Sequence, residues 1–102
     1  MKLINNVTLT GIIGFVGKSV PTKNGSMCNF SLGFGNGKDK DNKAKYGNVR
    51  CTTFDTAVVD NVINLGKGAK VLVTGRIAEN DYTNKEGKEI KEVILIVDNV
   101  CQ

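Results

Sequence analysis

The chain has 102 residues, 40% of them apolar and 24% charged, which is enough for one compact core but not for two. Fourteen lysine and arginine residues against ten acidic ones give a net charge of +4, a mild bias toward anionic partners. The sequence contains no histidine, which excludes imidazole bases, histidine-based nucleophile relays and histidine-containing zinc sites, so we do not expect an enzyme.

The apolar runs and the cysteines favour a cytoplasmic protein. The longest apolar run, Val93 to Val97, is too short to span a membrane, and polar residues interrupt the N-terminus before it reaches signal-peptide length. Three cysteines, an odd number without a Cys-x-x-Cys pair, argue against a secreted disulfide framework. We expect all three, Cys28, Cys51 and Cys101, to be small buried residues.

The first part of the chain predicts a bent strand and then a turn. Apolar and polar residues alternate from Leu3 to Gly14, which is the period of a strand. Glycines in and just after this segment, Gly11, Gly14 and Gly17, predict a bulge or a sharp bend of the kind that turns a barrel corner. The Asn24-Gly25 pair then predicts a tight hairpin turn.

Two further strands are predicted on either side of a charged loop. Cys28 to Phe34 alternates again, and we expect Phe30, and also Phe15 of the first strand, in the core. The segment from Asn36 to Lys45 has no apolar period and predicts a loop. The third strand, Tyr46 to Phe54, carries five residues on one face: Tyr46, Asn48, Arg50, Thr52 and Phe54.

The second half predicts one helix and two strands. Apolar residues recur with helical spacing between positions 58 and 65, with Asp55 or Thr56 able to cap the start and a glycine able to end it. Ala69 to Ile77 predicts a fourth strand, and Asn84 to Gly87 a second hairpin loop. Ile90 to Val97 predicts a fifth strand that is apolar on both faces.

This order of elements predicts a mainly β protein. Five strands, long hairpin loops and one short helix between strands 3 and 4 match the OB-fold, a five-stranded Greek-key barrel. We therefore expect a single OB-fold domain over residues 1–102. Ligands of that fold usually bind on strands 2 and 3 and on the loops that join strands 1 to 2 and 4 to 5.

Short motifs follow one another along the chain in an order that is specific as a set. They are Asn6-Val7-Thr8-Leu9-Thr10-Gly11, Pro21 with Asn24-Gly25, Asn29-Phe30-Ser31-Leu32, Arg50, Phe54, Lys67-Gly68, Gly75-Arg76, Tyr82, Gly87 and Val97-Asp98-Asn99. In this order they resemble the bacterial and phage single-stranded DNA-binding proteins. The resemblance implies sequence-tolerant binding of single-stranded DNA, usually by homotetramers, that protects the strand in replication, recombination and repair. It places the protein in the bacterial cytoplasm and nucleoid or in a phage-infected cell, without a cofactor.

The resemblance also implies particular binding residues. Tyr82 stands where the family has a tryptophan in its last hairpin, Phe54 resembles its stacking phenylalanine, and Arg50 a basic residue beside the DNA. Asn48 stands where the family often has a second stacking tryptophan, and Tyr46, two residues earlier on the same face, is a partial substitute.

The chemistry of single-strand binding extends this set, because it needs cations for phosphates and exposed rings for bases. The full set of candidates is Phe34, Lys38, Lys40, Lys43, Lys45, Tyr46, Asn48, Arg50, Phe54, Lys67, Arg76, Tyr82 and Lys85. Alternatives stay open for several of them. The lysines fit a solvated surface equally well, and Arg50 fits a cross-strand ion pair. Tyr82 and Phe54 could instead pack in the core or in an interface, and Phe34 could turn inward with Phe30 and Leu32.

Two features depart from the family pattern. The chain has no tryptophan, and Ala78-Glu79-Asn80-Asp81 stands where family members often carry basic residues, so weaker or differently placed DNA contacts are expected. The sequence also ends at Gln102 without the flexible, acidic-tipped tail through which bacterial members recruit partners. This is expected either of a tail-less subgroup, such as some phage versions, or of a truncated chain.

Other readings fit less well. A primosome-type accessory protein, which is an OB-fold of similar size and often dimeric, is the main alternative, followed by an OB domain that binds only proteins. The glycines from Gly33 to Gly37 lack the spacing of a phosphate-binding loop and no helix follows them. Asp39 and Asp41 lie among lysines without a third carboxylate, so we expect no metal site.

Overall fold

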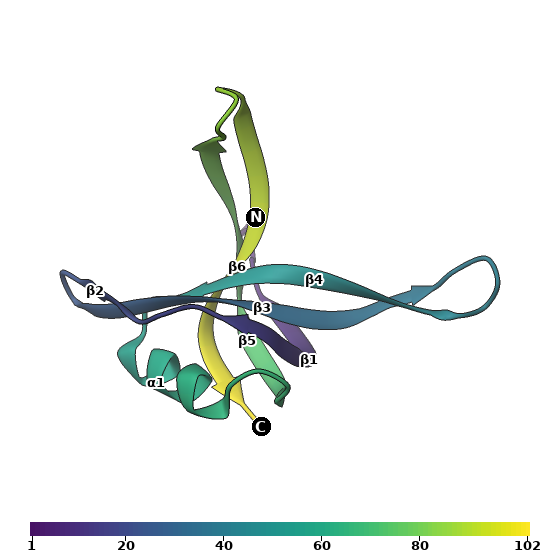
Figure 1. Ribbon diagram of the computed structural model, residues 1–102, viewed down its shortest axis with the longest axis horizontal. Coiled ribbons are helices and arrows are strands. Elements are labelled where there is room, and N and C mark those ends of the chain that lie inside the picture. The colour runs from purple at the N-terminus through teal and green to yellow at the C-terminus, as the bar shows by residue number, and fades with distance from the viewer.

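Five long strands form a closed barrel with one helix in the computed structural model, which describes residues 1–102 (Figure 1). The elements are β1 (Val7–Val16), β2 (Val20–Thr22), β3 (Gly25–Lys38), β4 (Ala44–Thr53), α1 (Thr56–Leu65), β5 (Lys70–Thr83) and β6 (Glu89–Cys101). The sheet order is β1-β5-β6-β4-β3-β2, and an additional pairing of β1 with β3 closes the barrel. This confirms the predicted OB-fold, with α1 between the third and fourth long strands and β2 as a short addition.

The first strand changes its neighbour half-way along. Residues Val7 to Ile12 pair with β5, whereas Ile12, Ile13 and Val16 pair with β3. At the crossing point a side chain on Gly11 would overlap the carbonyl oxygen of Gly33, so only glycine allows the two strands to approach. The predicted bend at the glycines is therefore confirmed.

A β-bulge interrupts the pairing of β1 with β3 between Ile13 and Val16. Ile13 is fully buried, and regular alternation would also turn Phe15 inward. The bulge instead turns Phe15 outward, where 65% of it is exposed, and lets Val16 pack against the core. The expectation that Phe15 is a core residue was therefore wrong.

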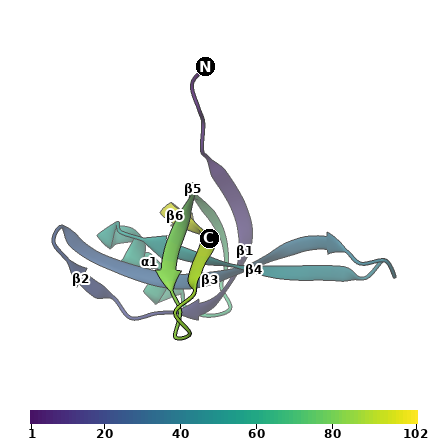
Figure 2. The same ribbon diagram turned by 90° about the horizontal axis from the view of Figure 1, so that it is seen from above.

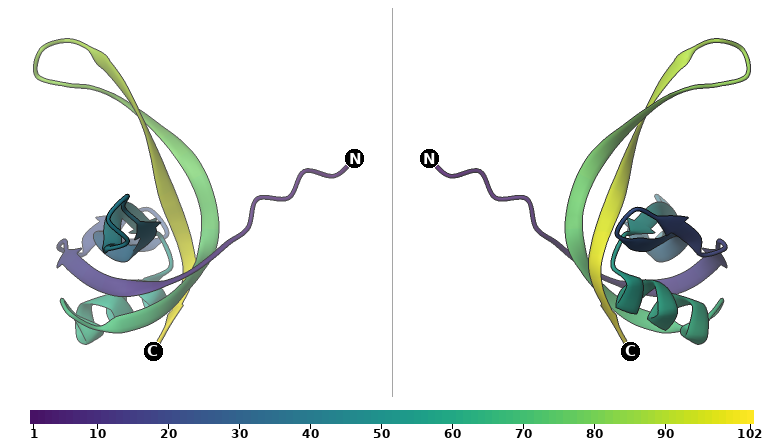
Figure 3. Two further views of the ribbon diagram at one scale, coloured as in Figure 1. Left: turned by 90° about the vertical axis from the view of Figure 1, so that its right-hand side faces the viewer. Right: turned by 90° about the vertical axis from the view of Figure 1, so that its left-hand side faces the viewer.

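The first strand also begins four residues later than predicted. The side chain of Asn5, rather than its backbone, continues the ladder with β5. Its Nδ2 donates to the carbonyl oxygen of Ile77 at 2.8 Å, and the amide of Ile77 donates to Oδ1 at 3.0 Å. Residues before Asn5 extend away from the barrel (Figures 2 and 3).

The core fills the inside of the barrel. Its largest fully buried side chain is Phe30, as predicted, with Ile13 and Leu32 beside it. Cys28 and Cys51 are buried as expected, and burial raises the pKa of the Cys51 thiol from 9.0 to about 12. The expectation was wrong for the third cysteine, because Cys101 at the end of β6 is exposed.

The helix α1 lies at the end of the barrel away from the β5–β6 hairpin tip (Figures 1 and 3). Its N-cap is Asp55, whose carboxylate accepts hydrogen bonds from the amides of Ala57 and Val58. Buried valines attach the helix to the barrel, so packing offsets their low helix propensity. It is too short to cross a membrane.

Two long hairpins, β3–β4 and β5–β6, project from the barrel in different directions (Figure 1). Both are longer than predicted: β3 and β4 pair as far as Lys38 and Ala44, which leaves only five residues of the expected charged loop unpaired. The first turn also differs slightly, because Thr22 pairs with Gly25 and the turn centres on Lys23 and Asn24.

The tips of the two long hairpins are built in the same way. At the β3–β4 tip, Oδ1 of Asp39 accepts from the amides of Asp41 and Lys43 at 2.8 and 3.0 Å. At the β5–β6 tip, Oδ1 of Asn84 accepts from the amides two and four residues later at 2.9 and 3.0 Å. The fourth residue of each turn, Asn42 or Gly87, has a positive φ angle.

Candidate nucleic-acid interface

The side chains predicted to share one face of the third strand lie on the outer side of the β3–β4 hairpin. Side chains of β4 alternate, so Tyr46, Asn48 and Arg50 point away from the core while Val49 and Cys51 point toward it. Tyr46 is 80% exposed, and Phe54, directly after β4, is 56% exposed. Two aromatic rings and one guanidinium group are thus available on one side of the barrel.

The β5–β6 hairpin forms the second wall of a groove over this face. The groove has a volume of about 360 Å³. It is lined by Met27, Asn29, Arg50, Thr52 and Phe54 from β3, β4 and the residue after β4, and by Arg76, Ala78, Glu79, Asn80, Ile94 and Ile96 from β5 and β6. Tyr82 lies farther along β5 on the same face as Arg76 and Asn80, because these residues are separated by even numbers. It is 43% exposed.

Arg50 crosses the groove to an acidic residue that the sequence did not single out. Its Nη1 lies 3.6 Å from Oε1 of Glu92 on β6, so the structure has the cross-strand ion pair that was left open as an alternative. Oε1 of Glu92 is buried and has no hydrogen-bond partner. A carboxylate therefore competes for the same guanidinium group that would contact a phosphate.

Asn29 on β3 is a second groove residue that was missed. The hydroxyl of Thr52 donates to its Oδ1 at 2.7 Å, which fixes the side-chain amide on the floor of the groove. The sequence pattern could have indicated Asn29, because it lies between the inward-facing Cys28 and Phe30 and therefore faces outward.

Phe34 is placed differently from the other candidate rings. It shares the face of Leu32, opposite to that of Tyr46 and Arg50, and is half-buried. A side chain on its partner Gly47 would collide with the far end of the Phe34 ring, so the ring lies over that glycine. Phe34 is thus on the side of Leu32 but does not join the core cluster of Phe30 and Leu32.

The candidate lysines are spread over three regions. Lys38, Lys40, Lys43 and Lys45 lie in and beside the β3–β4 tip, and Lys85 lies at the β5–β6 tip. All are exposed, and none forms an ion pair. Lys67 follows α1 and does not line the groove.

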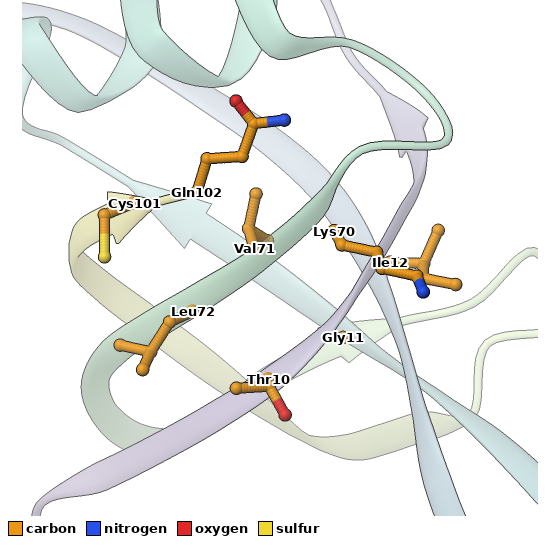
Figure 4. Close-up of a pocket in the computed structure, with 8 residues that line it drawn as sticks. All are labelled: Thr10, Gly11, Ile12, Lys70, Val71, Leu72, Cys101 and Gln102. Carbon is orange, nitrogen blue, oxygen red and sulfur yellow. The ribbon is translucent and has the colours of Figure 1, made fainter.

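A separate apolar hollow of about 520 Å³ lies over β1, β5 and the end of β6 (Figure 4). It is lined by Thr10, Gly11, Ile12, Lys70, Val71, Leu72, Cys101 and Gln102. It contains no aromatic ring and a single cation, so it offers no surface on which bases could stack.

A family model described as the single-strand binding protein family matches residues 4–101. The chain belongs to this family. The match confirms the resemblance drawn from the motifs, and the groove between the two hairpins lies on the face that this fold commonly uses for ligands. A search of curated proteins finds no match.

Solved structures agree with the fold. The chain is similar to the single-stranded DNA-binding protein of Plasmodium falciparum in complex with single-stranded DNA, with a TM-score of 0.80, 23% identity and coverage of 96% and 90% of the two chains. It is also similar to a small single-stranded DNA-binding protein from Streptomyces coelicolor, with a TM-score of 0.74, 13% identity and coverage of 94% and 91%.

Proposed function

We propose that this single-strand binding protein coats single-stranded DNA without sequence preference and protects it during replication, recombination and repair. One observation carries the proposal: exposed rings and guanidinium groups gather around one groove. Phe54, Arg50 and Arg76 line it, and Tyr46 and Tyr82 extend the same faces along the two hairpins. Membership of the family supports it, as does the similar fold of the Plasmodium protein, whose structure holds single-stranded DNA.

The groove suits a single strand because it offers bases a stacking surface. Every base has a π face, so stacking on Tyr46, Phe54 and Tyr82 requires no particular sequence. A duplex hides these faces inside its own stack. Arg50 and Arg76, with the lysines of the two hairpin tips, would contact phosphates, and Asn48 would contact a base or sugar. We propose that the protein acts by binding alone, without catalysis.

We also propose that the protein acts as a homo-oligomer, with a tetramer favoured over a dimer. Residues Val7 to Gly11 pair with β5 on one side only, so the other edge of β1 is free to pair with a second copy. The apolar hollow beside it, with Ile12 and Leu72, supports contact between subunits. A mass measurement in solution tests this, since a monomer would refute it and a dimer would favour a primosome-type role.

The central experiment is a titration of fluorescent oligo-dT at several salt concentrations. We expect affinity to fall as salt rises, with log K decreasing by about 0.7 per log unit of salt for each phosphate neutralised. A duplex of equal length and an RNA oligonucleotide serve as competitors. No binding to oligo-dT at low salt would refute the proposal, and tighter binding of the duplex would refute its single-strand character. Replication and recombination proteins are the partners to test afterwards by co-precipitation on DNA.

A further inference from the structure

The exposed ring of Phe15 has no role in the fold or in the groove described above. The bulge in β1 is what turns it outward, and it is fixed by a hydrogen bond from the amide of Phe15 to Oγ of Ser31 at 2.8 Å. A bulge of this kind commonly re-aims a side chain beside a functional site.

The ring lies in a hollow of about 500 Å³ next to the groove. Phe15, Lys18 and Val20 line it from β1, β2 and their connection, and Asn29, Ser31 and Arg50 line it from β3 and β4. Asn29 and Arg50 also line the groove between the hairpins, so the two spaces adjoin at these residues. A strand that leaves the groove past Arg50 therefore reaches Phe15 directly.

The chemistry of this hollow repeats that of the groove. Phe15 provides an apolar ring, and Lys18 and Arg50 provide positive charges on two sides. Gly17, which also lines the hollow, lets the chain approach β3 closely, because a side chain there would overlap the carbonyl oxygen of Asn29. No acidic residue lines the hollow.

We infer that this hollow is an additional nucleotide subsite, in which Phe15 stacks on a base while Lys18 and Arg50 contact the adjoining phosphate. The inference rests on the proposed function, since it extends the path of the same single strand. It predicts that the bound strand turns from the outer face of β3 and β4 toward β1, so the bulge belongs to the binding surface.

Single-tryptophan variants test the subsite directly, because the chain has no tryptophan of its own. The variants are Phe15→Trp, Phe54→Trp in the groove, and Ile63→Trp on the exposed face of α1 as the control. Stacking on a base quenches tryptophan emission. We expect saturating oligo-dT to quench the first two variants and to leave the control unchanged.

The outcomes separate the subsite from the proposed function. Quenching of Phe54→Trp without quenching of Phe15→Trp overturns the subsite and leaves the function intact. Failure of all three variants to bind oligo-dT, measured by anisotropy of labelled DNA, refutes the proposed function and the subsite with it.

Affinity provides an independent measurement. Loss of one stacked base corresponds to a decrease in affinity of about 5- to 150-fold, and we expect this for Phe15→Ala with a long oligo-dT. Phe15→Leu, which keeps an apolar side chain but has no π face, should bind as weakly as Phe15→Ala. The control variant Ile63→Ala should bind as the wild type does. The decrease should disappear with oligonucleotides too short to reach β1. Normal binding of long oligo-dT by Phe15→Ala, or restoration by leucine, overturns the assignment.

Discussion

Replacing Glu92 by glutamine is expected to strengthen binding of single-stranded DNA while slightly weakening the fold. Glu92 holds Arg50 across the groove at 3.6 Å, and both side chains are partly exposed, at 31% and 51%. A phosphate must compete with this carboxylate for the guanidinium group and is also repelled by it. The substitution removes both effects and keeps the size of the side chain.

The magnitude follows from the geometry. Two unit charges at this separation attract each other by about 1 kcal/mol in water, and exposed pairs contribute about 0.2 to 1 kcal/mol to stability. We therefore expect Glu92→Gln to lower the free energy of unfolding by at most about 1 kcal/mol. The affinity for oligo-dT should rise by up to about fivefold, because that energy no longer opposes transfer of Arg50 to a phosphate.

Salt dependence separates this effect from a general change in charge. An Arg50 shared with Glu92 neutralises a phosphate only in part, so freeing it should steepen the slope of log K against log salt by up to about 0.7. Glu89→Gln is the matched control, since it changes the net charge equally but lies on the opposite face of β6. Equal slopes and equal affinities for the two variants would show that the pair does not restrain Arg50.

Three further predictions address stacking, strand packing and the buried thiol. Tyr82→Ala should weaken oligo-dT binding by about 5- to 150-fold and Lys43→Ala by much less, since a stacked ring contributes more than one exposed cation. Equal losses would contradict the stacking role of Tyr82. Gly75→Ala should lower the free energy of unfolding by more than about 2 kcal/mol in urea denaturation, because the added methyl group would overlap a carbonyl oxygen of β6. Gly35 has open space around it, so Gly35→Ala should change the free energy of unfolding by at most about 1 kcal/mol. The raised pKa of Cys51 keeps its thiol neutral in the folded protein, whereas the thiol of the unfolded chain ionises above pH 9.0. The free energy of unfolding should therefore fall between pH 9.0 and about 12, and a Cys51→Val variant should lose less stability over that range.

The barrel was predictable from the sequence because its inner strands have a clear apolar period. Cys28, Phe30 and Leu32 recur at every second position, and each is buried. The same period on β4 places Tyr46 and Arg50 on one face. Faces are set by local alternation, and this information is contained in the sequence.

The hairpin arms and the bulge were harder to predict for physical reasons. The arms extend beyond the core, so Gly35, Lys38 and the residues from Ala78 to Thr83 pair through their backbones without an apolar pattern. The direction of Phe15 depends on a hydrogen bond to Ser31, which is distant in the sequence. Glu92 faces Arg50 only because β6 lies beside β4 in the closed barrel. Each of these features depends on tertiary pairing.

The matching turns at the hairpin tips bear on how the two arms can respond to a ligand. At each tip one side-chain oxygen, of Asp39 or Asn84, already binds two backbone amides. Such a loop has little conformational entropy left to lose when a strand lies against it. Under the proposed function, DNA would therefore meet each tip as a loop whose backbone is already ordered before binding.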